Sequence, residues 1–147
     1  MRLISRRDAI GLGVFVAVAG HTAALASPVE AESEIARFSA GATPQTRNIT
    51  IDLPEIAENG NSVPLAIAID SPMTERDHVS EVLVVAERNP RPVVAKFQFT
   101  PMAGRAQAST RIRLASSQSI IVLAKTNSGV LFVSQRPVKV TIGGCGG

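Results

Sequence analysis

From Arg47 to the end of the chain, apolar and polar residues alternate in short runs. The clearest run is 63–69, where every second residue is Val, Leu or Ile. Such alternation is typical of strands that bury one side and expose the other. The same pattern, or a short continuous apolar run, predicts further strands at 49–53, 82–86, 93–99, 108–114, 120–123, 130–133 and 138–142.

Turn-forming residues separate these runs. Clusters of Gly, Pro, Asn and Ser lie at 58–61, 70–72, 89–92, 101–104 and 127–129. Seven or eight short strands with this punctuation predict an antiparallel β-sandwich. The triplet Asn127-Ser128-Gly129 is expected to close a hairpin between 120–126 and 130–133. No internal repeat or long linker is present, so we predict one β-sandwich domain over 47–142.

Residues 27–46 differ from the rest because they are small, polar and acidic, without period-two alternation. Two structures fit this extension. It forms a short helix that uses Ile35 and Phe38, or it stays loose. Gly41 and Pro44 would end any such helix.

The first 26 residues have the features of an export signal. Arg6 and Arg7 precede an apolar run of 12 residues, and Ala24 and Ala26 provide a small-x-small cleavage site. The run is too short to cross a hydrocarbon core of about 30 Å as a helix. The arginine pair favours the twin-arginine route over the general secretory route. We therefore expect cleavage after Ala26 and a periplasmic mature protein.

Cleavage changes the charge of the chain. It removes Arg2, Arg6, Arg7 and Asp8, so the 15 basic and 12 acidic residues become 12 and 11. The mature chain of 121 residues then has a net charge of about +1 and no cluster of basic and aromatic residues. Near neutrality gives no electrostatic reason to bind nucleic acid. We expect neither a nucleic-acid nor a membrane partner.

The side chains available after cleavage argue against an enzyme. The mature chain has one histidine, His78, and one cysteine, Cys145. A zinc site needs three or four converging ligands, and a Ser-His-Asp triad would need His78 without the usual G-x-S-x-G turn. We therefore predict that His78 is an exposed loop residue and that the chain binds no metal and no cofactor. Arg111 and Arg113 share a strand face, which we expect to be solvated, the alternative being a partner surface.

The chain ends in Gly143-Gly144-Cys145-Gly146-Gly147, directly after the last predicted strand. Glycine lacks a Cβ and samples many backbone conformations. We therefore predict a flexible arm over 143–147, which has a reach of roughly 17 Å when fully extended. Only the thiol protrudes from this thin arm, which suits entry into a narrow channel of another protein.

A single cysteine in an exported protein points to a working thiol or to an intermolecular disulfide. We predict that Cys145 is the covalent attachment site of a carrier. The alternative is an assembly module that Cys145 crosslinks. A redox enzyme is less favoured, because the chain lacks a C-x-x-C motif and no base adjoins Cys145, so a partner has to activate the sulfur. On this view Gly144→Val leaves folding intact and slows each partner step.

The ending 138–147 resembles the SoxY family of thiosulfate-oxidation carrier subunits, whose hallmark is a C-terminal Gly-Gly-Cys-Gly-Gly. The segment 52–64, Asp-Leu-Pro-Glu-Ile-Ala-Glu-Asn-Gly-Asn-Ser-Val-Pro, is similar to that family, as is Asp-Ser-Pro-Met at 70–73. The resemblance runs from about Thr46 to Gly147 and therefore covers most of the mature chain.

This resemblance implies an immunoglobulin-like sandwich that pairs with a second β-sandwich subunit, SoxZ, in a heterodimer or heterotetramer. Sulfur intermediates would be carried covalently on Cys145. A haem enzyme of the SoxAX type would couple thiosulfate to that sulfur, and a manganese hydrolase of the SoxB type would release sulfate. A SoxCD-type sulfur dehydrogenase would oxidise the remaining sulfane sulfur, or that sulfur would be transferred elsewhere. The haem and manganese belong to these partners.

Overall fold

A computed structural model describes residues 28–144, which form one α-helix, one 3-10 turn and eight strands. Helix α1 covers Pro28–Ser39 and the turn η1 covers Pro101–Ala103. The strands are β1 (Ile49–Asp52), β2 (Ile56–Asn59), β3 (Val63–Ile69), β4 (Val79–Ala86), β5 (Val93–Gln98), β6 (Ala106–Ile112), β7 (Gln118–Thr126) and β8 (Leu131–Ile142). Several predicted site residues lie outside the described residues, namely Arg6, Arg7, Ala24, Ala26, Cys145, Gly146 and Gly147.

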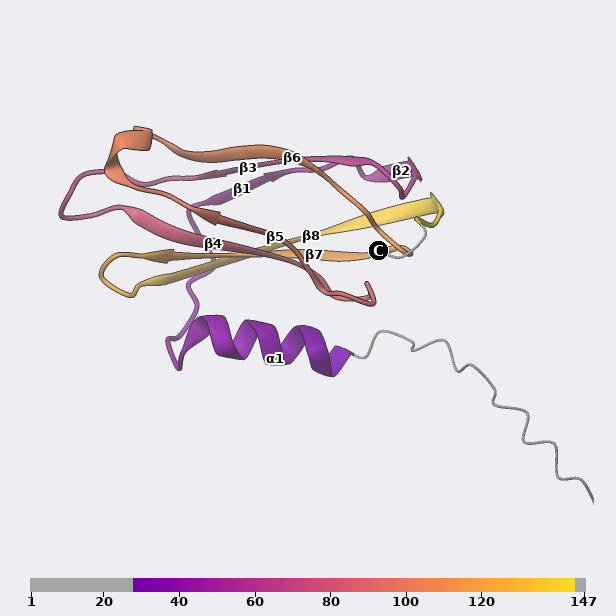
Figure 1. Cartoon of the computed structure of the whole chain (residues 1–147), viewed down its shortest axis with the longest axis horizontal. Helices are drawn as coiled ribbons and strands as arrows, with labels where there is room; N and C mark the ends of the chain where they lie inside the picture. The colour runs from indigo at the N-terminus through magenta and orange to yellow at the C-terminus, as the bar shows by residue number, and fades with distance from the viewer. Residues whose placement is uncertain (1–27, 145–147) are drawn as a thin grey trace, which may run out of the picture.

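The strands form two sheets that face each other (Figure 1). One sheet has the order β1-β3-β6, and the other has the order β2-β8-β7-β4-β5. Their facing sides meet in one core that takes buried residues from both sheets, among them Leu65, Val84 and Val122. The predicted all-β, immunoglobulin-like sandwich is therefore confirmed.

Strand β3 shows why the alternating pattern predicted its strand correctly. Val63, Leu65, Ile67 and Ile69 are buried, whereas the residues between them are exposed or half-buried. Only one side of this strand faces the core, so a period of two in the sequence becomes a period of two in burial. Strand β4 behaves differently, since Val82–Ala86 are buried without interruption.

Helix α1 explains the continuous burial in β4. It lies on the outer side of the five-stranded sheet, away from the other sheet (Figure 1). Val82 and Val84 point into the main core, whereas Leu83 and Val85 belong to a second apolar cluster that contains Ala31 of the helix. The five-stranded sheet thus has a hydrophobic layer on each side, and the extension before Arg47 is helical over Pro28–Ser39.

The helix contacts the sheet through one apolar side. Ala31, Ile35 and Phe38 are spaced as residues on one helix face, and all three belong to the second cluster. The Nζ of Lys125 lies 4.8 Å from the centre of the Phe38 ring. The helix ends where Ala40 and Gly41 adopt φ values of 48° and 82°, as the position of Gly41 predicted.

This contact predicts that Ala31→Glu destabilises the domain. Ala31 is 3% exposed, so a carboxylate there would be buried without a partner. We expect the free energy of unfolding to fall by about 2–4 kcal/mol, measured by urea denaturation of the mature chain. Ala36 is exposed on the same helix, so Ala36→Glu is the matched control and should change stability little. Equal effects of the two substitutions would show that α1 does not pack on the sheet.

Two strands differ from the predictions. Residues 58–61 were predicted to form only a turn, yet 56–59 form the edge strand β2, which pairs in parallel with β8. The predicted sandwich was wholly antiparallel, so this parallel pair is a correction. Apart from Val130, the predicted strands 130–133 and 138–142 are parts of one strand, β8, which begins at Leu131 and continues through Pro137. The predicted hairpin is confirmed, since β7 and β8 pair antiparallel around Gly129, whose φ is 87°.

Candidate functional site

The last strand leads to the base of the glycine-rich tail. Strand β8 ends at Ile142, and Gly143 and Gly144 follow before the described residues end. The Gly60 N–H donates to the Ile142 carbonyl at 2.7 Å. The Leu114 N–H donates to the Gly60 carbonyl at 2.8 Å, and the Gly144 N–H donates to the Leu114 carbonyl at 2.8 Å. Three distant segments of the chain thus meet at this end of the sandwich.

These segments approach so closely that side chains would not fit. A Cβ on Gly144 would lie 2.8 Å from the Gly60 carbonyl oxygen and 3.1 Å from the Asn61 nitrogen. A Cβ on Gly143 would overlap the Ala115 carbonyl oxygen, and a Cβ on Gly60 would overlap the Leu114 carbonyl oxygen. Glycine is therefore needed here for close backbone approach.

This geometry changes the description of the predicted arm. Gly143 and Gly144 were assigned to a freely moving arm, but the structure holds them against the loops that follow β2 and β6. Gly144 is also buried. The rest of the predicted arm, Cys145, Gly146 and Gly147, falls outside the described residues.

A buried pair of amide side chains supports the loop after β6. Asn89 is 1% exposed, and its Oδ1 accepts hydrogen bonds from the Ala115 N–H at 3.0 Å and from the Gln118 Nε2 at 2.9 Å. Its Nδ2 donates to the Arg113 carbonyl at 2.7 Å. The Gln118 Oε1 accepts from the Arg88 N–H at 2.9 Å. This network fixes the backbone on which Gly143 lies.

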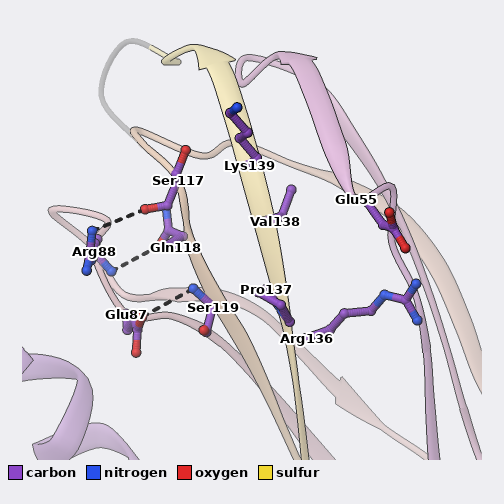
Figure 2. Close-up of a pocket in the computed structure, with 10 residues that line it drawn as sticks. All are labelled: Glu55, Glu87, Arg88, Ser117, Gln118, Ser119, Arg136, Pro137, Val138 and Lys139. Carbon is purple, nitrogen blue, oxygen red and sulfur yellow. Dashed lines mark hydrogen bonds between the residues drawn. The ribbon is translucent and has the colours of Figure 1, made fainter.

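A shallow groove of about 730 Å³ lies beside the tail base, along β7 and β8. Figure 2 shows that Arg88, Arg136 and Lys139 line it together with Glu55 and Glu87. Three basic and two acidic side chains nearly balance, so charge alone selects neither anions nor cations here. Ser117, which lines the groove, also accepts a hydrogen bond from the Val140 N–H at 2.9 Å, three residues before Gly143.

Comparison with known proteins identifies the family of this chain. The sequence model of the family described as sulfur oxidation protein SoxY matches residues 35–145. The chain belongs to the SoxY family. It is also similar to the solved structure of the sulfur carrier protein SoxY from Chlorobium limicola f thiosulfatophilum, at 31% identity and a TM-score of 0.66. That match covers 79% of this chain and 100% of the other.

More distant structures share only the fold. A superoxide reductase (neelaredoxin) variant from Ignicoccus hospitalis aligns with a TM-score of 0.58 at 17% identity, covering 77% of this chain and 91% of that one. A putative superoxide reductase from Thermotoga maritima aligns at 0.53 and 20% identity, covering 65% and 87%. A comparison with curated protein sequences finds no match. The SoxY match ends at Cys145, the residue that follows the tail base.

The sequence singled out three further residues of this SoxY-family chain, His78, Arg111 and Arg113. His78 is half-buried rather than fully exposed, and its Nδ1 lies 3.0 Å from the Thr74 carbonyl oxygen. Arg111 and Arg113 are exposed, and the Arg111 guanidinium donates to Ser62 Oγ at 3.2 Å. Between residues 28 and 144, no group of three or more His, Cys, Asp or Glu side chains could hold a metal ion. In the same range, no helix has the length and apolarity needed to cross a membrane.

Sequence reasoning missed the residues that support the tail. Gly60 and Asn89 were interpreted as turn residues, and Leu114 as the end of a strand. Their contacts join positions far apart in the sequence, which local patterns do not reveal. The segment Asn59-Gly60 lies within a stretch that resembles the SoxY family, but the resemblance assigned it no role.

Proposed function

We propose that this chain is a carrier that holds sulfur intermediates on Cys145 during thiosulfate oxidation and is not itself an enzyme. The observation that supports this most directly is that the SoxY family match extends to Cys145, the only cysteine of the chain. The solved SoxY from Chlorobium is named a sulfur carrier protein, and this chain aligns with all of it. A carrier needs one reactive sulfur on an accessible segment, and we assign that role to Cys145 between its flanking glycines.

The first proposed step joins thiosulfate to the carrier. The Cys145 thiolate and the outer sulfur of thiosulfate form a sulfur–sulfur bond, giving Cys–S–S–SO₃⁻. This bond formation releases two electrons, which a haem enzyme of the SoxAX type accepts. The second step is hydrolysis by a manganese enzyme of the SoxB type. Water attacks the sulfone sulfur, sulfate and protons leave, and Cys–S–S⁻ remains. A SoxCD-type dehydrogenase is a candidate for the oxidation of that remaining sulfur.

Covalent attachment has a chemical reason. Free persulfides are readily oxidised further or exchanged with other thiols. A bound intermediate stays with one protein until the next enzyme takes it. The proposed setting is the periplasm, reached by the twin-arginine route that Arg6 and Arg7 favour. The proposed structural partner is a SoxZ-like β-sandwich subunit.

The alternative function is a periplasmic assembly module that Cys145 crosslinks. A truncated chain that ends at Gly144 separates the two functions, because it keeps the hydrogen bond to Leu114 and loses only Cys145–Gly147. If the chain is a carrier, the truncated protein should still bind its SoxZ-like partner and support no thiosulfate-dependent electron transfer. If it is an assembly module, truncation should remove a covalent dimer and leave thiosulfate oxidation intact.

A further inference from the structure

We infer that Gly60, Leu114 and Gly144 form a backbone anchor that positions the cargo-bearing end of this carrier at one end of the sandwich. Gly60 and Gly144 are positioning residues in this arrangement. The role of the anchor rests on the proposed function, because the anchor determines how Cys145 is presented to partner enzymes. The existence of the anchor is tested without any sulfur chemistry.

The anchor consists of successive hydrogen bonds between three segments. Gly60 donates to the end of β8 and accepts from Leu114, whose carbonyl in turn accepts from Gly144. The loop after β2, the loop after β6 and the tail are thereby joined in one small backbone network. Asn89 holds the second of these loops through its bond to the Ala115 N–H. The tail base is therefore part of the folded domain.

Glycine is required at both positions for reasons of space. Among residues 28–144, the glycines with left-handed backbone conformations are Gly41, Gly104 and Gly129, and a Cβ added to any of them would meet no atom within 4 Å. Gly60 and Gly144 show the opposite combination, with ordinary φ values and backbone atoms within 3 Å of an added Cβ. Close packing, rather than chain reversal, therefore explains glycine at these two positions.

The anchor limits how far the cargo can travel. A free five-residue arm could reach roughly 17 Å, but an anchor at Gly144 leaves three residues beyond it. The attachment residue is then one peptide link from the domain. A partner enzyme must bring its active site against the loops at 59–61 and 114–116, or it must open the anchor. While the anchor is closed, this end of the sandwich is therefore the surface at which a partner enzyme meets the cargo.

Amide exchange in the unmodified mature chain tests the anchor directly. The Gly144 N–H has a hydrogen-bond acceptor in the Leu114 carbonyl. We expect NMR to show its exchange slowed by about tenfold or more relative to an unstructured glycine. The Gly60 and Leu114 amides should be protected as well. Exchange of Gly144 at the unstructured rate would overturn the inference.

Spin labelling tests the role of the glycines. A nitroxide attached to Cys145 labels a single site, because the chain has one cysteine. We expect Gly144→Ala to increase nitroxide mobility several-fold, since the added Cβ detaches the tail base from Gly60. Gly146→Ala places the same methyl group on the other side of Cys145 and is the matched control. Equal mobility in the two variants would show that the tail base is not anchored.

A second variant tests the anchor from the domain side. Gly60→Ala should increase label mobility in the same way, and Gly129→Ala, at the far hairpin, controls for general destabilisation. If Gly60→Ala fails to fold, the Gly144→Ala result still decides, because a chain end can detach without unfolding the domain. Failure of the carrier function would appear as missing sulfur adducts, and failure of the anchor would appear only in exchange and mobility.

Discussion

Replacement of Cys145 by serine is expected to reduce thiosulfate-dependent electron transfer to the rate measured without the carrier. Serine has nearly the same size, but its hydroxyl cannot form the sulfur–sulfur bond on which each proposed step depends. The measurement is reduction of a c-type cytochrome by the reconstituted system with thiosulfate as substrate. No partial activity is expected, because the chain has no second cysteine to substitute.

The fold of the Cys145→Ser variant should be unchanged. The apolar clusters that hold the sandwich together are built from residues before Cys145, and the substitution changes none of these residues. Thermal unfolding and binding to a SoxZ-like subunit should therefore match those of the unmodified chain. Electron transfer at the normal rate would refute the assignment of Cys145. A variant that unfolds would instead require a structural role for this residue.

Removal of the Asn89 side chain is expected to cause a large loss of stability. Asn89→Ala leaves the Ala115 N–H, the Arg113 carbonyl and the Gln118 amide without their buried partner. We expect the free energy of unfolding to fall by about 3 kcal/mol, because each buried polar group left unpaired costs about 1–3 kcal/mol. For a domain of this size the midpoint of thermal unfolding should fall by roughly 10 °C.

Asn127 offers the matched control for this substitution. It is exposed, and its side chain accepts from the His78 N–H and donates to the Arg76 carbonyl, both at 3.1 Å. Because water can replace these partners, Asn127→Ala should cost less than about 1 kcal/mol. Similar losses in the two variants would contradict the view that the buried amide network supports the loop beside the tail base.

The anchor also changes the expectation for Gly144→Val. The sequence alone predicted an intact fold and a stiffer arm. In the structure even the Cβ of that residue would approach the Gly60 carbonyl oxygen at 2.8 Å. We now expect valine to detach the tail base, so any slowing of the partner steps would come from lost positioning as well as from stiffness. The domain itself can remain folded, because detachment frees only the chain end.

The sandwich was predictable because the alternation of apolar and polar residues within a strand reflects which side of the strand is buried. In β3 each buried residue alternates with a more exposed one, and the turn at Gly129 uses the residue that its geometry favours. The helix was predictable only as one of two options, since Ala31, Ile35 and Phe38 are few and weakly patterned. The layer that α1 adds explains why β4 is apolar without interruption.

The parallel pairing of β2 had no local signal. Its four residues are mostly exposed, and Ala57 is the one that is buried. Strand β2 pairs with β8, which lies about 80 residues later in the chain. No sequence pattern within β2 predicts that pairing. Pro137 was an equally misleading signal, because it suggested a break within a strand that continues through it.

The reactive residue of the candidate site was predictable from the sequence, whereas the residues that contact the tail base were not. A unique cysteine between glycines is visible in the sequence, and its type alone suggests sulfur chemistry. The surroundings of Gly144 come from loops near residues 60 and 114, which only the fold brings together. Gly60 and Asn89 therefore appeared as ordinary turn residues until their partners were known.

Intact mass spectrometry tests the carrier function most directly. The protein would be purified without reductant from cells grown on thiosulfate, and its tail peptide would be mapped afterwards. We predict sulfur-containing adducts that are confined to Cys145 and removed by a reductant. A Cys145 found only as free thiol or as a self-dimer, even after incubation with thiosulfate and the haem enzyme, would contradict the carrier function and favour the assembly module.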